Sequence, residues 1–295
     1  MPIFHKNKSK CRMDVLYLAL LWSPSALCLK IASKQLPPFT LLSICMGISS
    51  IVMLAACYYT KASLPKITPK LLINGFLLGT LCNGLPFTLQ TLASPHIDSI
   101  CLGLINSIIP IVTFIGCYLL FPDSKISLKN LFGLALGIIG TALLLFSGNE
   151  FSSSFPTHTL GVVLAVLSSS FYGFGLIYAN SLNLNNNIIF PTMHISSTLI
   201  YLLPLAYFLE SGIQMPELLP QTIASIVVLA LPATSLAFIY YYKILENSNA
   251  VTLSTVNYIL PIFKVILGVL ILGEAINLNF AMSSVLIIIG VFLIT

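Results

Sequence analysis

The chain alternates between long apolar stretches and short polar breaks. A helix needs about 20 residues, at 1.5 Å each, to cross the hydrocarbon core of a bilayer. Ten stretches approach or exceed this length, at 13–31, 39–60, 71–92, 97–121, 129–147, 160–181, 188–209, 221–243, 250–272 and 277–294. The breaks carry turn residues, such as Pro37-Pro38, Pro122-Asp123 and Gly273-Glu274. The pattern predicts an all-α polytopic membrane protein with ten transmembrane helices.

A short motif occurs in both halves of the chain. Residues 106–111 read Asn-Ser-Ile-Ile-Pro-Ile, and residues 257–262, 151 positions later, read Asn-Tyr-Ile-Leu-Pro-Ile. Both copies lie inside an apolar stretch, where Asn needs a hydrogen-bond partner and Pro leaves a backbone carbonyl of the preceding turn unpaired. We therefore expect helix kinks at Pro110 and Pro261, at matching places in a duplicated protein.

The duplication also predicts how the two halves are related. Each half holds five spans, an odd number, so the second half enters the membrane from the opposite side. We expect two inverted five-helix repeats, at 13–147 and 160–294, after a cytoplasmic segment at 1–12. Inverted repeats of this kind are typical of secondary transporters that work by alternating access.

Composition and charge support a membrane location. The chain is 57% hydrophobic and 7% charged, with a mean hydropathy of +1.01, whereas soluble domains are about 25% charged. The net charge of +5 is spread over the breaks, which argues against a nucleic-acid partner. With a cytoplasmic N-terminus, ten Lys and Arg residues lie in inner segments and only Lys30 and Lys34 in outer ones. The sequence predicts a multi-pass protein of the plasma membrane, which is the inner membrane in bacteria.

The end of each half has the same layout: an apolar helix with a central Pro, a short acidic turn and a Gly-containing last helix. In the first half these are Pro110, Phe121-Pro122-Asp123 and Gly133 to Gly140, and in the second half Pro261, Leu272-Gly273-Glu274 and Gly290. Span one adds Trp22-Ser23 and Lys30. Over nearly its whole length the chain resembles the EamA family of the drug/metabolite transporter superfamily, although Ser23 and Pro24 replace the usual Gly region.

The resemblance implies ten helices around a central cavity, walled mainly by spans one, three, four, six, eight and nine. It also implies transport of small metabolites such as amino acids, sugars and nucleotide-linked compounds, often outward.

Span nine carries one polar face and an intramembrane cation. Ser254, Asn257 or Tyr258, Pro261 and Lys264 recur at three- and four-residue spacing, which places them on one side of a helix. A lysine inside a span costs about 2.5–3.5 kcal/mol on insertion scales unless it reaches water or a partner. Snorkelling to the outer surface is one solution. The other is a cavity role, in which Lys264 attracts a carboxylate of the substrate.

Other spans contribute further candidates for substrate binding. Asn106 in span four matches Asn257, and both amides fit either substrate binding or pairing with carbonyls that the prolines leave free. Span three carries Asn83 and Gln90 at seven-residue spacing, span one carries Trp22 and span six carries Tyr172. These rings could stack on a planar group.

Several other polar, aromatic and small residues in the spans favour a structural role. Tyr240 and Tyr241 near the end of span eight are expected to be interface anchors. Gly133, Gly137 and Gly140 predict close helix packing. Ser168 and Ser169 in span six are weaker candidates, and His194 is expected to be a satisfied buried histidine.

These features favour a secondary transporter, an exporter or exchanger, for a small carboxylate-bearing metabolite such as an amino acid or an S-adenosylmethionine-like compound. The expected partners are this substrate and the lipid bilayer, with no cofactor, metal or catalytic residues; the sequence carries no signal for an oligomeric state. Two other classes remain open: a membrane scaffold or assembly factor, and an intramembrane enzyme. No acidic residue falls at the centre of a predicted span, which favours exchange or uniport over proton-coupled transport.

Overall fold

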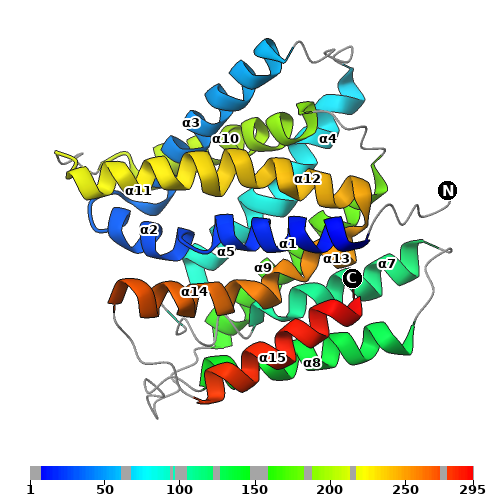
Figure 1. The fold of residues 1–295 in the computed structure, drawn as a ribbon. Coiled ribbons are helices and arrows are strands. Elements are labelled where there is room, and N and C mark those ends of the chain that lie inside the picture. The colour runs from blue at the N-terminus through cyan, green and yellow to red at the C-terminus, as the bar shows by residue number, and fades with distance from the viewer. Residues whose placement is uncertain are drawn as a thin grey trace.

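The computed structural model describes residues 8–60, 68–93, 96, 105–121, 127–146, 159–182, 188–212, 217–272 and 278–294, and within these ranges the chain is helical without strands. The helices of the first half (Figure 1) are α1 (Lys8–Trp22), α2 (Ser25–Ala32), α3 (Pro38–Tyr59), α4 (Pro69–Gly79), α5 (Leu85–Ala93), α7 (Ile108–Leu120) and α8 (Leu128–Phe146). Those of the second half are α9 (Thr159–Ser181), α10 (Ile189–Glu210), α11 (Pro220–Ala230), α12 (Ala237–Asn247), α13 (Ala250–Ser254), α14 (Val256–Leu272) and α15 (Leu278–Ile294). The breaks at Pro122-Asp123 and Gly273-Glu274 lie outside the described residues.

Six helical segments of the described chain are long and apolar enough to cross a membrane. They are Cys11–Leu29, Pro38–Tyr59, Pro69–Ala93, Thr159–Ser181, Ile189–Glu210 and Pro220–Asn247. Shorter apolar helices occupy the remaining predicted stretches, at Ile108–Leu120, Leu128–Leu143, Ala250–Phe263 and Ala281–Ile294. The helical fold and the presence of several membrane-length helices are therefore confirmed. That all ten segments cross the membrane stays a prediction.

Regular helices pair across the two halves of the chain. Helix α3 packs on α10, and α8 packs on α15 along the lower edge of Figure 1. At the α8–α15 contact, a Cβ atom on Gly133 would lie 2.7 Å from the carbonyl oxygen of Gly290, and a Cβ atom on Gly290 would lie 2.7 Å from that of Gly133. A Cβ atom on Gly140 would likewise lie 3.0 Å from the Ser283 oxygen. The predicted close packing through span-five glycines is confirmed.

Two spans contain a π-helical turn. One turn, Thr80–Gly84, lies between α4 and α5, and the other, Leu231–Leu236, lies between α11 and α12. The two turns begin 151 positions apart (231 − 80), which is the spacing of the repeated motif. A π turn pairs each N–H with a carbonyl five residues earlier. The hydroxyls of Thr234 and Ser235 follow the same spacing, because they donate to the carbonyls of Leu229 at 2.7 Å and Ala230 at 3.0 Å.

The helices of spans one, four and nine are each interrupted by a turn. Span one breaks at Ser23-Pro24, because Pro24 has no N–H to continue the helix, and the Ser23 hydroxyl donates to the Leu20 carbonyl at 2.8 Å. Span four breaks at Ser107, just before α7, and span nine breaks at Thr255, between α13 and α14. Irregular backbone inside a membrane protein is tolerated where protein or water surrounds it. The break residues Ser23, Ser107 and Thr255 are accordingly buried in the bundle.

The breaks lie near the two motif prolines rather than at them. Pro110 is the third residue of α7, and the turn at Ser107 precedes it; Pro261 is inside α14, six residues after Thr255. Proline affects the helix on its N-terminal side, because its ring excludes the carbonyl four residues earlier. The expected irregularity thus appears one to two turns before each proline.

A carboxylate from one half caps a helix of the other half. Glu210, at the end of α10, accepts hydrogen bonds from the backbone N–H of Phe39 at 3.0 Å and of Thr40 at 2.7 Å, and from the Thr40 hydroxyl at 2.7 Å. The N-cap residue of α3 is Pro37, which makes no side-chain cap. Glu210 satisfies donors that would otherwise be orphaned and complements the positive end of the helix dipole.

Candidate functional site

A three-helix contact centres on the amide of Asn106. Its Oδ1 atom accepts a hydrogen bond from Gln90 Nε2 at 3.2 Å and another from the Ser169 hydroxyl at 3.0 Å. Gln90 comes from α5 and Ser169 from α9, and Asn106 is a helical residue directly before the turn at Ser107. Gln90 and Asn106 are half-buried, and Ser169 is fully buried. We call these three residues the Asn106 cluster; the structure brings together two predicted site residues and one weaker candidate.

The neighbouring serine of span six has a different partner. Ser168 donates to the carbonyl of Pro86 at 2.8 Å and is fully buried. That carbonyl is in the first turn of α5, so the contact fastens α9 to α5. The two adjacent hydroxyls of α9 therefore have different partners. Ser168 binds a backbone carbonyl of α5, whereas Ser169 binds the side-chain amide of Asn106.

Asn83 does not join the Asn106 cluster. Its Nδ2 atom donates to the Thr198 hydroxyl of α10 at 3.3 Å. Asn83 lies within the π turn at Thr80–Gly84, where the extra residue rotates it away from the face expected from an uninterrupted α-helix. Seven-residue spacing therefore does not place Asn83 and Gln90 against the same neighbours. Thr198, which the sequence did not single out, is the residue that Asn83 contacts.

Asn257 bonds within its own span. Its Nδ2 atom donates to the Ser254 carbonyl at 3.0 Å. In a regular helix this carbonyl would accept from the N–H of Tyr258, but that N–H bonds to the Thr255 carbonyl at 3.0 Å instead. The expected partner was a carbonyl freed by the proline, but Asn257 pairs with one that the break at Thr255 leaves free. The residue is half-buried.

Tyr258 is fully buried, with 0% of its surface exposed. Its ring fills the space beside Gly137 of α8, where a Cβ atom would lie 2.5 Å from the ring. The Tyr258 hydroxyl has no hydrogen-bond partner in the described structure. A substrate could reach this hydroxyl only after the helices move, so a binding role for Tyr258 stays a prediction.

An aromatic cluster fills the contact between α1 and α12. The ring of Trp22 lies 6.5 Å from that of Phe238 and 6.4 Å from that of Tyr241, measured between centroids. Tyr241 is 1% exposed, so the prediction that it is an interface anchor is wrong. Tyr240, the next residue back, is half-buried and packs on the Tyr17 ring at 5.7 Å. Consecutive residues of a helix point in different directions, and one of them faces the core.

His194 and Tyr242 extend this cluster to α10. Nδ1 of His194 hydrogen-bonds to the Tyr242 hydroxyl at 3.0 Å, and the imidazole ring lies 4.7 Å from the Phe238 ring. Nε2 of His194 is buried without a partner among the described residues. The histidine is therefore buried as predicted, but only half satisfied.

Tyr172 approaches the same region from α9. It lies close enough to Cys82 and Tyr241 to interact with both electrostatically, and the Tyr241 hydroxyl donates to Cys82 Sγ at 3.6 Å. Gly175 allows Cys82 to approach, since a Cβ atom on it would lie 2.5 Å from that sulfur. Two of the three aromatic residues predicted for the site, Trp22 and Tyr172, thus border one buried cluster around Tyr241.

Lys264 belongs to α14, but its side chain lies outside the described part of the structure. Its counterpart in the first half, Thr113, is fully buried and donates to the Ile109 carbonyl at 2.8 Å. In the part of the chain that the structure describes, no three His, Cys, Asp or Glu residues are placed to hold a metal ion.

Comparisons with known proteins agree with this architecture. An uncharacterized transporter of Archaeoglobus fulgidus is 25% identical over 97% of this chain and 98% of its own length. The uncharacterized transporter YoaV of Bacillus subtilis is 21% identical over 97% of each chain. One solved structure, titled only as the crystal structure of a protein, has a TM-score of 0.79 at 18% identity and covers 98% of this chain and 97% of that chain. It shares the fold.

The model of the EamA-like transporter family matches residues 14–146 and again residues 159–295. Together the two matches cover nearly the whole chain, and the relatives are named as transporters. The chain therefore belongs to the EamA-like transporter family and is a multi-pass membrane transporter.

Proposed function

We propose that the protein is a secondary transporter that moves a small carboxylate-bearing metabolite by alternating access between two inverted five-helix halves. Amino acids and S-adenosylmethionine-like compounds are the first candidates, carried by export or exchange. The family supplies the transporter function. The substrate, the mechanism and the orientation are the proposal.

The spacing of irregular backbone supports the inverted repeat. Both π turns occur in the third span of a half, and they are separated by the same 151 positions as the Asn-Pro motif. The packing repeats as well. Helix α1 packs on α12 and α5 packs on α9, so that in each contact the first span of one half meets the third span of the other. Duplicated and inverted halves would produce these matching contacts.

The position of the two ends of the chain supports an even number of crossings. Arg12 lies in the second turn of α1, with its guanidinium 3.7 Å from the ring centroid of Phe292 in the last turns of α15. It also donates to the Phe292 carbonyl at 3.4 Å. The first and the last helix therefore meet at one end of the bundle, as ten crossings require. The excess of Lys and Arg in the predicted inner segments assigns this end to the cytoplasm of a plasma or bacterial inner membrane.

The Asn106 cluster is the observation that carries the proposed site. Amide and hydroxyl groups from three spans converge inside an apolar bundle, beside a break in span four. Polar residues inside a membrane protein are rare and mark substrate pathways. We assign substrate binding to this cluster together with Asn257, Tyr258 and Lys264 of span nine, and also to Trp22, Tyr172 and Asn83. Lys264 is assigned to the carboxylate of the substrate.

Counterflow into proteoliposomes tests the proposal. The protein is reconstituted with a panel of amino acids and S-adenosylmethionine, as wild type and as Lys264→Ala. We expect the wild type to exchange at least one carboxylate compound, and Lys264→Ala to reduce that exchange about tenfold or more, the loss expected for one charge-assisted contact. Lys129→Ala is the matched control, because Lys129 is exposed at the start of α8.

Three results would overturn parts of the proposal. Unchanged exchange in Lys264→Ala removes the assignment of the carboxylate to Lys264. A folded protein that exchanges no compound favours a scaffold or assembly factor. Chemical conversion of a compound during the assay indicates an intramembrane enzyme.

A further inference from the structure

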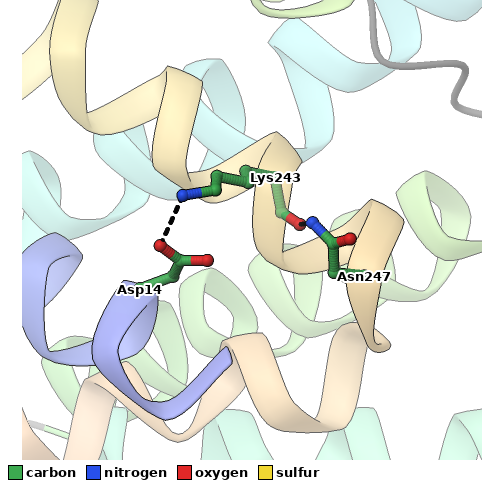
Figure 2. A network of polar contacts seen from close by, with 3 residues as sticks. All are labelled: Asp14, Lys243 and Asn247. Atoms are coloured by element: carbon green, nitrogen blue, oxygen red, sulfur yellow. Dashed lines mark hydrogen bonds and ion pairs between the residues drawn. The ribbon is translucent and has the colours of Figure 1, made fainter. Parts of the chain in front are cut away.

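A charged pair joins the first span to the eighth. Lys243 Nζ of α12 lies 2.7 Å from Asp14 Oδ1 of α1, as Figure 2 shows. Asp14 is nearly buried, with 5% of its side chain exposed, whereas the Lys243 side chain is 35% exposed. One turn further along α12, Asn247 donates from Nδ2 to the Lys243 carbonyl at 2.8 Å and completes the network.

The position of the pair makes it sensitive to separation of the two helices. It lies at the end of the bundle that holds Arg12 and the end of α12, and the Tyr240 ring is 5.0 Å from Lys243 Nζ. A buried carboxylate is stable only while it is paired or hydrated. While α1 contacts α12, Lys243 supplies the pairing. When the helices separate, water must solvate the Asp14 carboxylate in place of Lys243. Water can reach it beside the Lys243 side chain, which is partly exposed.

At the opposite end of the bundle, the described residues form an apolar cluster. There α5 and α9 meet around the buried residues Ala93, Ile105 and Ala165. Under the proposed inverted repeat, this α5–α9 contact corresponds to the α1–α12 contact. Among the described residues, an ion pair thus joins the helices at one end, and an apolar cluster lies at the other.

We propose that the Asp14–Lys243 pair is a latch that closes the bundle between α1 and α12 at the end where the N-terminal residues lie. Opening of this end during transport breaks the pair, and formation of the pair closes the end again. This inference rests on the proposed alternating-access function, because only a transporter of that kind opens the two ends in turn.

A native cysteine reports on the latch. Cys11 lies three residues before Asp14 on α1, is 6% exposed and lies near Ser248, which follows α12. Separation of α1 from α12 would expose its thiol. The experiment measures the rate at which a membrane-impermeant maleimide labels the full-length protein in lipid nanodiscs. Cys11→Ser supplies the background from the other cysteines.

Four proteins are compared: wild type, Asp14→Asn, Lys243→Gln, and a charge swap that combines Asp14→Lys with Lys243→Asp. We expect Cys11 labelling to be about tenfold faster in both single variants, a factor within the usual range for coupling between two states. We expect the swap to return toward the wild-type rate, which a merely misfolded protein would not do. Glu217→Gln is the control, since Glu217 is exposed and lies at the other end of α11–α12.

Equal labelling rates in wild type and both single variants would overturn the latch. So would a swap that labels as fast as the single variants. The labelling result does not depend on a known substrate. If the protein exchanges no compound but shows the expected labelling, the data support the latch and contradict the proposed transport. If it exchanges a compound but labelling does not change between variants, the data support transport and contradict the latch.

Discussion

The hydroxyl of Ser169 donates to Oδ1 of Asn106 at 3.0 Å and thereby links the two halves of the chain. Ser169 belongs to the first helix of the second half, and Asn106 to the repeated motif of the first half. Gln90 adds a second donor to the same oxygen. An amide that accepts two hydrogen bonds from different helices is held in position, which a transported molecule would require of a contact residue.

We expect Ser169→Ala to reduce the free energy of unfolding by about 0.5–1.5 kcal/mol, the usual net contribution of one hydrogen bond. Substrate exchange should also fall, because the Asn106 amide loses one of its two fixed contacts. Ser170→Ala is the matched control, since among the described residues the Ser170 hydroxyl bonds to the Val166 carbonyl of its own helix. Thermal unfolding in detergent and counterflow measure the two effects. Equal losses in the two variants would contradict a special role for Ser169.

Gly290→Ala should destabilise the α8–α15 contact by about 1–3 kcal/mol, the range for overpacking a tight interface. The added methyl group would lie 2.7 Å from the carbonyl oxygen of Gly133, and neither backbone can yield without moving a helix. Gly212→Ala introduces the same group where nothing lies within 4 Å. A melting temperature that is unchanged for Gly290→Ala would show that these helices separate more readily than the structure indicates.

Glu210→Ala removes the cap from α3 and should reduce the free energy of unfolding by about 1–2 kcal/mol, as the loss of a helix N-cap usually does. The start of α3 should also exchange its amide hydrogens faster, which hydrogen–deuterium exchange detects at Phe39 and Thr40. Glu217→Ala removes a carboxylate from the neighbouring exposed loop and serves as the control. Protection of those two amides that does not change in Glu210→Ala would contradict the capping role.

Tyr258→Phe should leave stability unchanged or raise it by up to about 1 kcal/mol, because the buried hydroxyl that is removed has no partner. Tyr242→Phe makes the same chemical change but removes a hydrogen bond to His194, and it should destabilise by about 1 kcal/mol. Circular dichroism during heating compares the two proteins. A stable Tyr258→Phe protein that has lost exchange would show that the hydroxyl contacts substrate in another conformation.

Several features were predictable because they depend on residues close together in the sequence. The apolar stretches, the basic inner segments and the repeated Asn-Pro motif led to a helical membrane protein of the EamA-like family, which the family model supports. The close packing through Gly133, Gly137 and Gly140 followed from three- and four-residue spacing, which places small residues on one face. The repeated motif singled out Asn106, and Gln90 was singled out as a polar residue of an apolar span; the two meet in the structure.

Spacing failed where the backbone departs from the α-helix or where the partner is distant. One additional residue in the π turn directs Asn83 to Thr198 instead of the Asn106 cluster. Tyr241 near the end of a span resembles an interface anchor, yet α1 and α10 cover it. Asp14 lies at the start of the first predicted span, and only the approach of α12 supplies its partner, Lys243, from 229 positions away.

Helix periodicity and hydrophobic length are local properties of the chain, so the amino-acid sequence was sufficient to define the helical membrane fold and the residue types along each face. Which faces meet depends on packing between helices that are far apart in sequence, and on π turns and breaks that rotate the residues beyond them. For that reason only the tertiary structure separated Asn83 from Gln90, enclosed Tyr241 and Tyr258, and joined Asp14 to Lys243.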